Sequence, residues 1–388
     1  MSSSEAPRRL PLAEPSLGGN AAAYLAECVE STYVSSIGAF VDRFEREFAD
    51  SVGSRFAVAC NSGTAALHLA FTALGVGPGD DVLVPTLTFV ASANPVRYLG
   101  ATPVLTDSEP ATLNMDPAIV VDELERRARA GLGQPRAIEV VHLVGHPADM
   151  VPILEVAGRF GVPVIEDASE ALGAAWTTGS LAGRQVGSVG LMGCFSFNGN
   201  KLITTGGGGM VTTDDESLAR RVRHLSTQAR LPGRVYDHDV VGFNYRLSNL
   251  AAALGVAQLE QLGELLAARR ENARAYEAAL ADLPGIEPAA RASWAEPSFW
   301  LYTARLSIPD AAERDRILDA LGSAGIDARP IWSPLHRTHL YSDAPLLGGA
   351  VADRIFDAAI SLPSSSTLRP ADRERVLDGL AAALSTAS

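Results

Sequence analysis

Short apolar runs alternate with stretches of helical periodicity through the first two-thirds of the chain. Five runs have the length and composition of buried strands: RFAVAC (55–60), DVLVP (81–85), TPVLTD (102–107), IEVVHLVG (138–145) and VPVIED (162–167). Between them lie segments with apolar residues at helical spacing, such as GTAALHLAFTALG, DPAIVVDELERRARAG and MVPILEVAGRFG. Strands that alternate with helices form βαβ units, which favour a mainly parallel sheet. The sequence therefore predicts an α/β fold.

The remainder of the chain has a different order of elements. GCFSFN (193–198) and GMVTTDD (209–215) are predicted as two more strands, and a long helix is predicted near residues 248–283. From about residue 290 the chain continues as a strand, FWLYTARLSI, a helix, a second strand, IDARPIW, and two terminal helices. We predict a large α/β domain over residues 10–260 and a smaller C-terminal α+β domain over residues 261–388.

Charge and composition exclude several classes of protein. The formal net charge is −13, which argues against a nucleic-acid partner. No stretch approaches the roughly 18 apolar residues of a membrane span, and the N-terminus lacks the apolar core of a signal peptide. The three cysteines, Cys28, Cys60 and Cys194, are too few and too scattered for a disulfide framework or a zinc cluster. We expect a cytoplasmic protein with no metal site.

Lys201 is the only lysine among 32 basic residues. A chain that uses arginine for every other cation has a reason to keep one amine, because a lysine amine can lose its proton and form a Schiff base with an aldehyde. A guanidinium stays protonated and is a poor nucleophile. Lys201 is therefore predicted to be a nucleophile; the alternative is chance survival of one surface lysine.

Polar residues cluster where the predicted strands end. Ser62, Gly63 and Thr64 open a helix directly after a strand, where N–H groups and hydroxyls favour a phosphate, although an ordinary helix cap has the same pattern. Asp167 ends the strand VPVIED, either as a ligand to a cationic group or as a local cap. Ser196 precedes Lys201, and the four glycines 206–209 follow it in a tight hairpin or beside a ligand. A phosphate pocket, a carboxylate and a lysine match the needs of pyridoxal 5′-phosphate.

Four blocks carry a family resemblance. In order and spacing they resemble the pyridoxal-phosphate-dependent nucleotide-sugar aminotransferases of the DegT/DnrJ type: NSGTAALHLAFTALGVGPGDDVLVPTLTFVASANPVRYLGATPV, VIEDASEALGA, FSFNGNKLITTGGGGMV and GFNYRLSNLAAALGVAQLEQL. The likeness extends over the chain from about residue 10. It implies the aspartate-aminotransferase fold, which is fold type I of the enzymes that use this cofactor.

The resemblance also implies residue roles. Lys201 would bind the cofactor covalently and later shuttle a proton, and Asp167 would pair with the pyridine nitrogen. Asn244 resembles a residue that reaches the phosphate of the neighbouring subunit, so the resemblance implies a homodimer with shared active sites. Phe89 would stack on the ring, or else pack in the core. The phosphate ligands implied are Ser62, Gly63, Thr64 and Ser196.

The segment after Asp167 departs from the usual pattern. Glu170 stands where most of the family has glutamine, at the position that contacts the phenolic oxygen of the cofactor. Together with SFNGNK and TYVSSIGAFVDRFE, it resembles the subgroup of the bacillosamine and legionaminic acid branch. The predicted reaction is therefore transfer of the amino group of L-glutamate to C4 of UDP-4-keto-6-deoxy-N-acetylglucosamine. Candidate substrate contacts are Tyr33, Arg246, Arg329 and His336.

Three alternatives remain open at this point. The first is an aminotransferase acting on dTDP-4-keto-6-deoxyglucose or a 3-keto sugar in secondary metabolism. The second is a sugar dehydratase that uses pyridoxal or pyridoxamine phosphate, although such relatives commonly have histidine at the position of Lys201. The third is a sensor without catalytic activity, which usually carries a basic DNA-binding segment that this acidic chain lacks.

Overall fold

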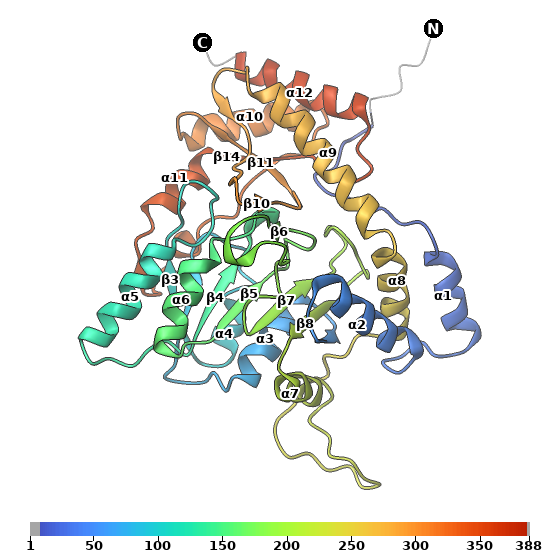
Figure 1. The fold of residues 1–388 in the computed structure, drawn as a ribbon. Coiled ribbons are helices and arrows are strands. Elements are labelled where there is room, and N and C mark those ends of the chain that lie inside the picture. The colour runs from blue at the N-terminus through green and yellow to red at the C-terminus, as the bar shows by residue number, and fades with distance from the viewer. Residues whose placement is uncertain (1–7, 386–388) are drawn as a thin grey trace.

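The computed structural model describes residues 8–385 and has an eight-stranded sheet at its centre (Figure 1). The strands lie in the order β1-β8-β7-β5-β4-β2-β3-β13, and their pairing is parallel from β7 to β13. Their bounds are β1 (Phe56–Cys60), β2 (Asp81–Pro85), β3 (Thr102–Thr106), β4 (Ala137–Val141), β5 (Val164–Asp167), β7 (Met192–Ser196), β8 (Gly209–Thr213) and β13 (Leu346–Leu347). The α/β prediction with a mainly parallel sheet is confirmed.

One edge of the sheet is antiparallel. The chain reverses after β7 and returns as β8, which pairs antiparallel with β7 and with β1. The glycines that follow Lys201 lie in this reversal. An added Cβ at Gly209 would lie 2.3 Å from the carbonyl oxygen of Ser62, so the loop before α3 (Gly63–Ala73) requires a glycine beside it. Gly209 and Ser196, at the two ends of this reversal, therefore lie against the start of α3.

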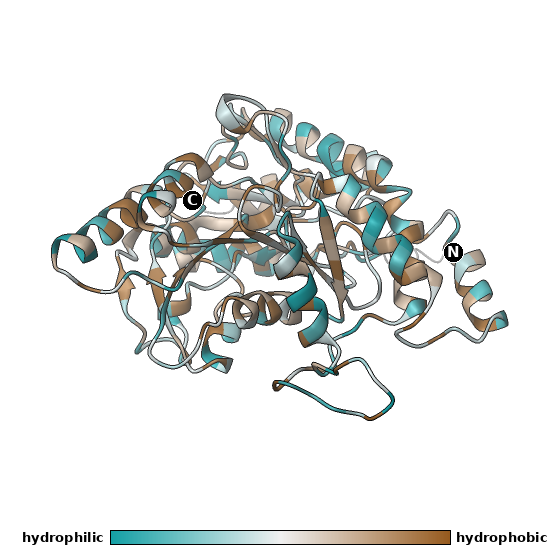
Figure 2. Ribbon diagram, turned by 60° about the horizontal axis from the view of Figure 1, so that its bottom comes forward, coloured by the Kyte–Doolittle hydropathy of each residue, from teal (hydrophilic) through white to brown (hydrophobic). Residues whose placement is uncertain are grey.

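Helices cover both faces of this sheet, and apolar residues lie between the layers (Figure 2). One face packs against α2 (Ala39–Val52), α5 (Pro117–Arg129), α6 (Met150–Phe160) and α8 (Asn249–Leu259). The other face packs against α3, α4 (Asn94–Tyr98) and α7 (Glu216–Ser226). The parallel strands are buried on both faces, which explains their nearly continuous apolar sequences.

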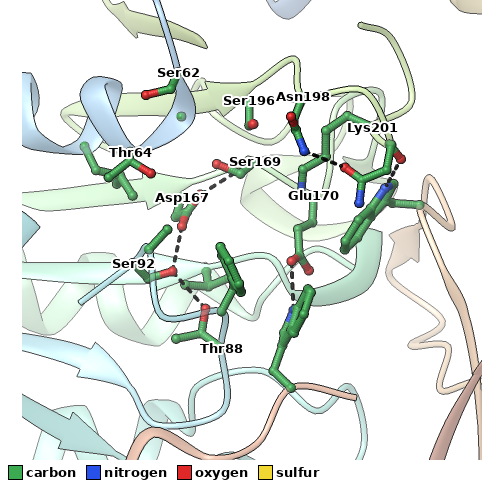
Figure 3. A pocket seen from close by; sticks show the side chains of 18 of the residues that line it. Ser62, Thr64, Thr88, Ser92, Asp167, Ser169, Glu170, Ser196, Asn198 and Lys201 are labelled. Atoms are coloured by element: carbon green, nitrogen blue, oxygen red, sulfur yellow. Dashed lines mark hydrogen bonds between the residues drawn. The ribbon is translucent and has the colours of Figure 1, made fainter. Parts of the chain in front are cut away.

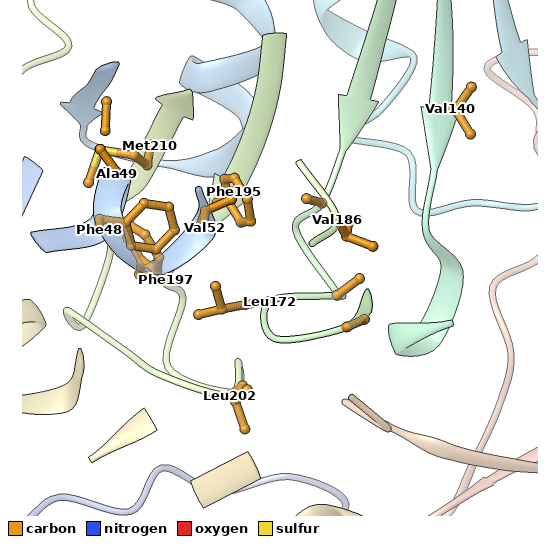
Figure 4. Close-up of a cluster of buried hydrophobic side chains, with 14 of the residues drawn as sticks. Phe48, Ala49, Val52, Val140, Leu172, Val186, Phe195, Phe197, Leu202 and Met210 are labelled. Carbon is orange, nitrogen blue, oxygen red and sulfur yellow. The ribbon is translucent and has the colours of Figure 1, made fainter. Parts of the chain in front are cut away.

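An aromatic cluster anchors the end of β7 (Figure 4). The Phe48 ring lies 4.9 Å from that of Phe195 and 5.3 Å from that of Phe197. Successive side chains of a strand point to opposite faces, so burial of Phe195 and Phe197 turns Ser196 toward the other side of the sheet. This core contact therefore orients the segment that leads to Lys201.

A second, four-stranded antiparallel sheet forms the C-terminal layer (Figure 1). It consists of β12 (Arg329–Pro330), β14 (Ala359–Leu362), β11 (Tyr302–Leu306) and β9 (Ile286–Glu287). It packs with α9 (Leu262–Leu280), α10 (Ala311–Ser323) and α12 (Pro370–Ser385) around its own apolar cluster. The remaining elements are α1 (Ala21–Glu30), α11 (Ala350–Ala358), β6 (Ala175–Trp176), β10 (Ala295–Glu296) and the 3-10 turns Leu143–Gly145, Gly179–Leu181 and Leu335–Arg337.

The single long helix predicted near residues 248–283 is wrong in one respect, because α8 and α9 are separate helices with a break at Glu260 and Gln261. The division into domains at residue 260 stays a prediction, and residues 386–388 of the smaller one lie outside the described part. Leu10 packs in the C-terminal cluster, while β13 joins the large sheet. A segment near the start of the chain thus packs in the C-terminal layer, and a strand from the C-terminal part of the chain joins the large sheet.

Within residues 8–385, no helix is long and apolar enough to cross a membrane. No group of three or more histidine, cysteine, aspartate or glutamate side chains in the same range is placed to hold a metal ion.

Glu139 is an unusual residue of the large sheet. It lies on β4 with no exposed surface, and neither carboxyl oxygen has a hydrogen-bond partner among the described residues. Burial, together with the nearby Asp167 carboxylate, raises the pKa of Glu139 well above its ordinary value of 4.5. The folded protein therefore holds this proton more tightly than the unfolded chain does, and stability falls as the pH rises from about 4.5 toward the folded-state pKa.

We expect Glu139→Leu to stabilise the protein by roughly 1–4 kcal/mol at pH 7, because a well-packed apolar side chain replaces an unsatisfied polar one. The gain should be larger at pH 8 than at pH 5. Urea unfolding at equal protein concentration and at both pH values measures it. Glu139→Gln is the matched control, since it removes the ionisation and keeps the buried polar group. A lower stability of Glu139→Leu at both pH values would contradict this account of the site.

Candidate functional site

A cavity of about 290 Å³ opens at the carboxyl ends of β5 and β7, beside the N-terminus of α3 (Figure 3). Ligands of open parallel sheets bind at this edge, where loops and helix N-termini converge. The lining residues come from segments far apart in the chain: Ser62, Gly63, Thr64, Leu67, Thr88, Phe89, Ala91, Ser92, Val141, Asp167, Ser169, Glu170, Ser196, Asn198, Asn200, Lys201, Gly207, Gly208, Trp300 and Trp332.

The N-terminus of α3 forms one end of the cavity. Ser62 caps the helix, because its hydroxyl accepts the N–H of Ala65 at 3.0 Å. The N–H groups of Gly63 and Thr64 in the first turn have no acceptor within the helix and carry its positive dipole end. A Cβ at Gly63 would lie 2.7 Å from the Cβ of Ser196, so glycine is needed for this close approach. The arrangement suits an anion such as phosphate.

Asp167 lies at the carboxyl end of β5 and is 4% exposed. Its Oδ2 accepts the hydroxyl of Ser92 at 2.9 Å, and its Oδ1 accepts the N–H of Ser169 at 3.0 Å. Ser92 is held in turn by Thr88, with 2.8 Å between the hydroxyl oxygens. Both oxygens of the carboxylate are therefore oriented before any ligand enters the cavity (Figure 3).

The neighbouring Glu166 points to the opposite face of β5, as the alternation of a strand requires. Its carboxylate contacts His142 Nε2 at 3.0 Å and accepts the N–H groups of Gly187, Val189 and Gly190. These contacts tie a loop to the sheet. Of the two adjacent carboxylates, only Asp167 lines the cavity.

Lys201 follows β7 and extends into the cavity toward Glu170 (Figure 3). Its Nζ lies 3.8 Å from the centre of the Trp300 ring. Burial lowers the pKa of Lys201 from its ordinary value of 10.5, while Glu170 and Asp167 oppose that shift. A lower pKa increases the fraction of neutral amine, which is the nucleophilic form.

Glu170 lies across the cavity from the helix N-terminus and is 7% exposed. Its Oε2 accepts the N–H of Val144 at 2.8 Å, and its Oε1 accepts the indole N–H of Trp332 at 3.0 Å. Burial raises the pKa of Glu170, whereas Lys201 and both N–H donors favour the charged form.

Aromatic rings form one wall of the cavity. The Phe89 ring, which is 47% exposed, lies 4.9 Å from the Trp332 ring, and the Trp332 and Trp300 rings are 6.3 Å apart and nearly parallel. Trp300 is fixed by its indole N–H, which donates to the carbonyl of Asn200 at 2.8 Å. Such a wall suits a flat ligand ring.

The donor set fits pyridoxal phosphate. The cavity combines N–H groups and hydroxyls for a phosphate, an oriented buried carboxylate for a protonated ring nitrogen, an amine for an aldehyde and an aromatic wall for the ring. Gly63 and Gly209, which allow close approach of the backbone, lie at the N-terminus of α3, where a phosphate would bind.

Eight of the predicted site residues line this one cavity: Ser62, Gly63, Thr64, Phe89, Asp167, Glu170, Ser196 and Lys201. Five do not. Asn244 and Tyr33 are exposed outside it, Arg246 lies near β1, and Arg329 pairs with Asp327 at 3.1 Å. His336 contacts Thr86 Oγ1 at 2.7 Å. The functions predicted for these five stay predictions.

Sequence reasoning missed several lining residues. Ser92 follows Thr88 by four residues in a segment outside any helix or strand, and this spacing gives no signal unless the position of Asp167 is known. Trp300 and Trp332 come from the C-terminal part of the chain. Their aromatic character alone predicts core packing, and only the tertiary fold places them at the cavity.

Comparison with known proteins gives concordant results. The chain matches the model of the DegT/DnrJ/EryC1/StrS aminotransferase family over residues 15–381. It is 44% identical to a GDP-perosamine synthase of Caulobacter vibrioides, covering 96% of this chain and 97% of that protein. A GDP-perosamine synthase of Escherichia coli is 38% identical, covering 92% of this chain and 94% of that protein. The structure of the aminotransferase TlmJ of Streptoalloteichus hindustanus has a TM-score of 0.87 and 30% identity, covering 97% of this chain and 99% of that chain.

Proposed function

The chain belongs to the DegT/DnrJ/EryC1/StrS aminotransferase family and is a pyridoxal-phosphate-dependent nucleotide-sugar aminotransferase; we propose that it transfers the amino group of L-glutamate to C4 of a nucleotide-linked 4-keto-6-deoxyhexose. The observation that carries this proposal is the position of Lys201. The single lysine of the chain lies in the cavity that also holds Asp167 and the N-terminus of α3.

Several of the lining residues have a defined role in this proposal. When bound, pyridoxal phosphate supplies an aldehyde that reacts with amines and a ring that accepts electrons. The hydroxyls of Ser62, Thr64 and Ser196 and the first N–H groups of α3 bind its phosphate. Asp167, oriented by Ser92 and by the N–H of Ser169, holds the positive charge of the ring nitrogen.

The remaining groups act on protons and on the ring. Lys201 Nζ would hold the cofactor covalently, and as a free amine it would move a proton at the carbon that bears the amino group. Phe89 would pack on the ring, and Glu170 would contact its phenolic oxygen. The amine of Lys201 lies 3.8 Å from the centre of the Trp300 ring, and this ring limits where the amine can move.

The proposal also names the acceptor sugar. Two relatives at 44% and 38% identity are GDP-perosamine synthases, which supports a GDP-linked 4-keto-6-deoxymannose, since perosamine is a 4-amino-4,6-dideoxymannose. The subgroup resemblance of the sequence favours UDP-4-keto-6-deoxy-N-acetylglucosamine instead. We place the GDP sugar first because the identity with its synthases extends over nearly the whole chain.

A substrate panel tests the acceptor. The protein loaded with cofactor is incubated with L-glutamate and, separately, the GDP, UDP and dTDP 4-keto-6-deoxy sugars, and kcat/KM is compared. We expect the GDP sugar to be preferred by roughly 100-fold, equivalent to about 2.7 kcal/mol of differential transition-state binding. A similar preference for the UDP or dTDP sugar would replace the acceptor and leave the aminotransferase assignment standing. L-Aspartate in place of L-glutamate is the control for the donor.

We also propose a homodimer in which Asn244 reaches the phosphate of the neighbouring subunit. Its exposed position outside its own cavity supports this arrangement. Mixing Lys201→Ala and Asn244→Ala chains under exchange conditions should restore activity, because each heterodimer then has one intact site of two, and both changes fall in the other. The measurement is turnover per heterodimer against each parent. No recovery in isolated heterodimers, or full activity of a monomer in sedimentation, would refute the shared site.

A further inference from the structure

We propose that Trp332 is a positioning residue that acts through Glu170, and that its indole N–H requires a carboxylate rather than a carboxamide at position 170. This deepens the proposed function, on which it rests for the contact between Glu170 and the cofactor. Within residues 8–385, Trp332 meets Glu170 through this hydrogen bond, and its ring lies near those of Phe89 and Trp300.

Two N–H donors meet the carboxylate of Glu170, and Figure 3 draws one of these hydrogen bonds as a dashed line. Val144 N–H reaches Oε2 at 2.8 Å, and the indole N–H of Trp332 reaches Oε1 at 3.0 Å. A carboxylate accepts on both oxygens. A carboxamide has one oxygen and one NH2 group, so in either orientation its NH2 would face one of these N–H donors. Glutamine at position 170 would therefore lose one hydrogen bond and place two donors in contact.

Trp332 cannot easily turn its N–H away. Its ring centre lies 4.9 Å from that of Phe89 and 6.3 Å from that of Trp300. Three residues later, the N–H of Leu335 donates to the carbonyl of Thr86 at 2.7 Å, which ties this segment to the end of β2. Two residues before Trp332, Pro330 pairs with β14 as part of β12 in the C-terminal sheet. The indole N–H is thus fixed between two layers of the protein.

The consequence is electrostatic as well as geometric. The charged groups that face Glu170 are the amine of Lys201 and the carboxylate of Asp167, and the buried guanidinium of Arg269 on α9 acts on Lys201. Removing the indole N–H makes the negative charge of Glu170 less stable. A weaker negative charge beside Lys201 disfavours its protonated form, and any group bound there titrates at lower pH.

The test begins without the cofactor. Thermal unfolding is measured for the wild type, Trp332→Phe, Glu170→Gln and the double variant at equal protein concentration. Phenylalanine keeps the ring and removes the N–H. Glu170→Gln should lower the midpoint, and Trp332→Phe in the same chain should recover at least half of that loss. Additive losses in the double variant would overturn the proposal. If the Glu170→Gln variant accumulates only in unfolded form, a double variant that folds shows the same rescue of stability. A double variant that also fails to fold overturns the proposed pairing of Trp332 with Glu170.

The second readout uses protein loaded with pyridoxal phosphate. The pH midpoint of its visible absorbance should move down by on the order of 0.5–1 unit in Trp332→Phe. Trp294→Phe is the matched control, since Trp294 lies outside the cavity against His146 and should leave the midpoint unchanged. An unchanged midpoint in Trp332→Phe would overturn the link to the cofactor. Failure of the protein to bind the cofactor would instead refute the proposed function. The pairing of Trp332 with Glu170 would still be tested, because the unfolding experiment does not require the cofactor.

Discussion

Lys201→Ala is expected to lower turnover by roughly 10⁴-fold or more, the largest effect of any single substitution in this chain. The variant loses the covalent attachment of the cofactor and the group that moves the proton, and no other lysine can replace it. The loss is measured as kcat with L-glutamate and the best acceptor of the substrate panel. Lys201→Arg is the matched control, because it keeps a cation of similar length and cannot form the covalent link.

A chemical experiment tests the same residue independently of turnover. Borohydride reduces the bond between a lysine and the aldehyde of pyridoxal phosphate to a stable amine. Mass spectrometry should then find one labelled peptide, containing FSFNGNKLITT, because the chain has only one lysine. Recovery of the label on the N-terminal amine alone would show that Lys201 does not bind the cofactor.

Asp167→Asn is expected to keep the fold and reduce kcat by roughly 10²–10³-fold. Asparagine can retain the contacts with the hydroxyl of Ser92 and the N–H of Ser169, since a hydroxyl can donate or accept. It cannot hold a positive charge on the ring nitrogen, and losing a charge-assisted pair costs about 3–4 kcal/mol in the reaction, equivalent to that factor in rate.

Circular dichroism and thermal unfolding should show that the Asp167→Asn variant is folded, and absorbance should show that it binds the cofactor. Ser92→Ala is a useful companion, because it removes one of the groups that orient Asp167 and leaves the charge. Its effect on kcat should be much smaller. An Asp167→Asn variant with bound cofactor and nearly normal kcat would remove Asp167 from the catalytic groups.

The strands of the large sheet were predictable from the sequence because buried parallel strands need short, continuous apolar runs. DVLVP coincides with β2, and VPVIED contains β5. The antiparallel pairing of β1 with β8 was not predictable. Whether an edge strand pairs parallel or antiparallel depends on its neighbour, and β8 is separated from β1 by most of the domain.

The break between α8 and α9 shows a limit of periodicity. Apolar residues continue at helical spacing across Glu260 and Gln261, so the pattern alone predicts one helix. In the structure, Glu260 bonds to Asn20 and Tyr24 near the start of the chain. A contact over that sequence separation leaves no local signal.

The proposed catalytic groups could be predicted from the sequence because their chemistry is rare. A single lysine, a carboxylate at the end of an apolar strand and a Ser-Gly-Thr helix start are each tied to a local element, and parallel strands bring the ends of those elements to one edge. The groups that orient them were not visible. Ser92, Trp300 and Trp332 are ordinary residues in ordinary segments.

Their roles depend on distance in space between segments that are remote in the chain. The hydroxyl of Ser92 meets Asp167 across 75 positions, and the indole of Trp332 meets Glu170 across 162. The sequence by itself determined which atoms of this protein can react, because reactivity belongs to the side chain. Only the tertiary structure decided how those atoms are held, because a hydrogen bond requires two groups within about 3 Å, and folding alone brings them there.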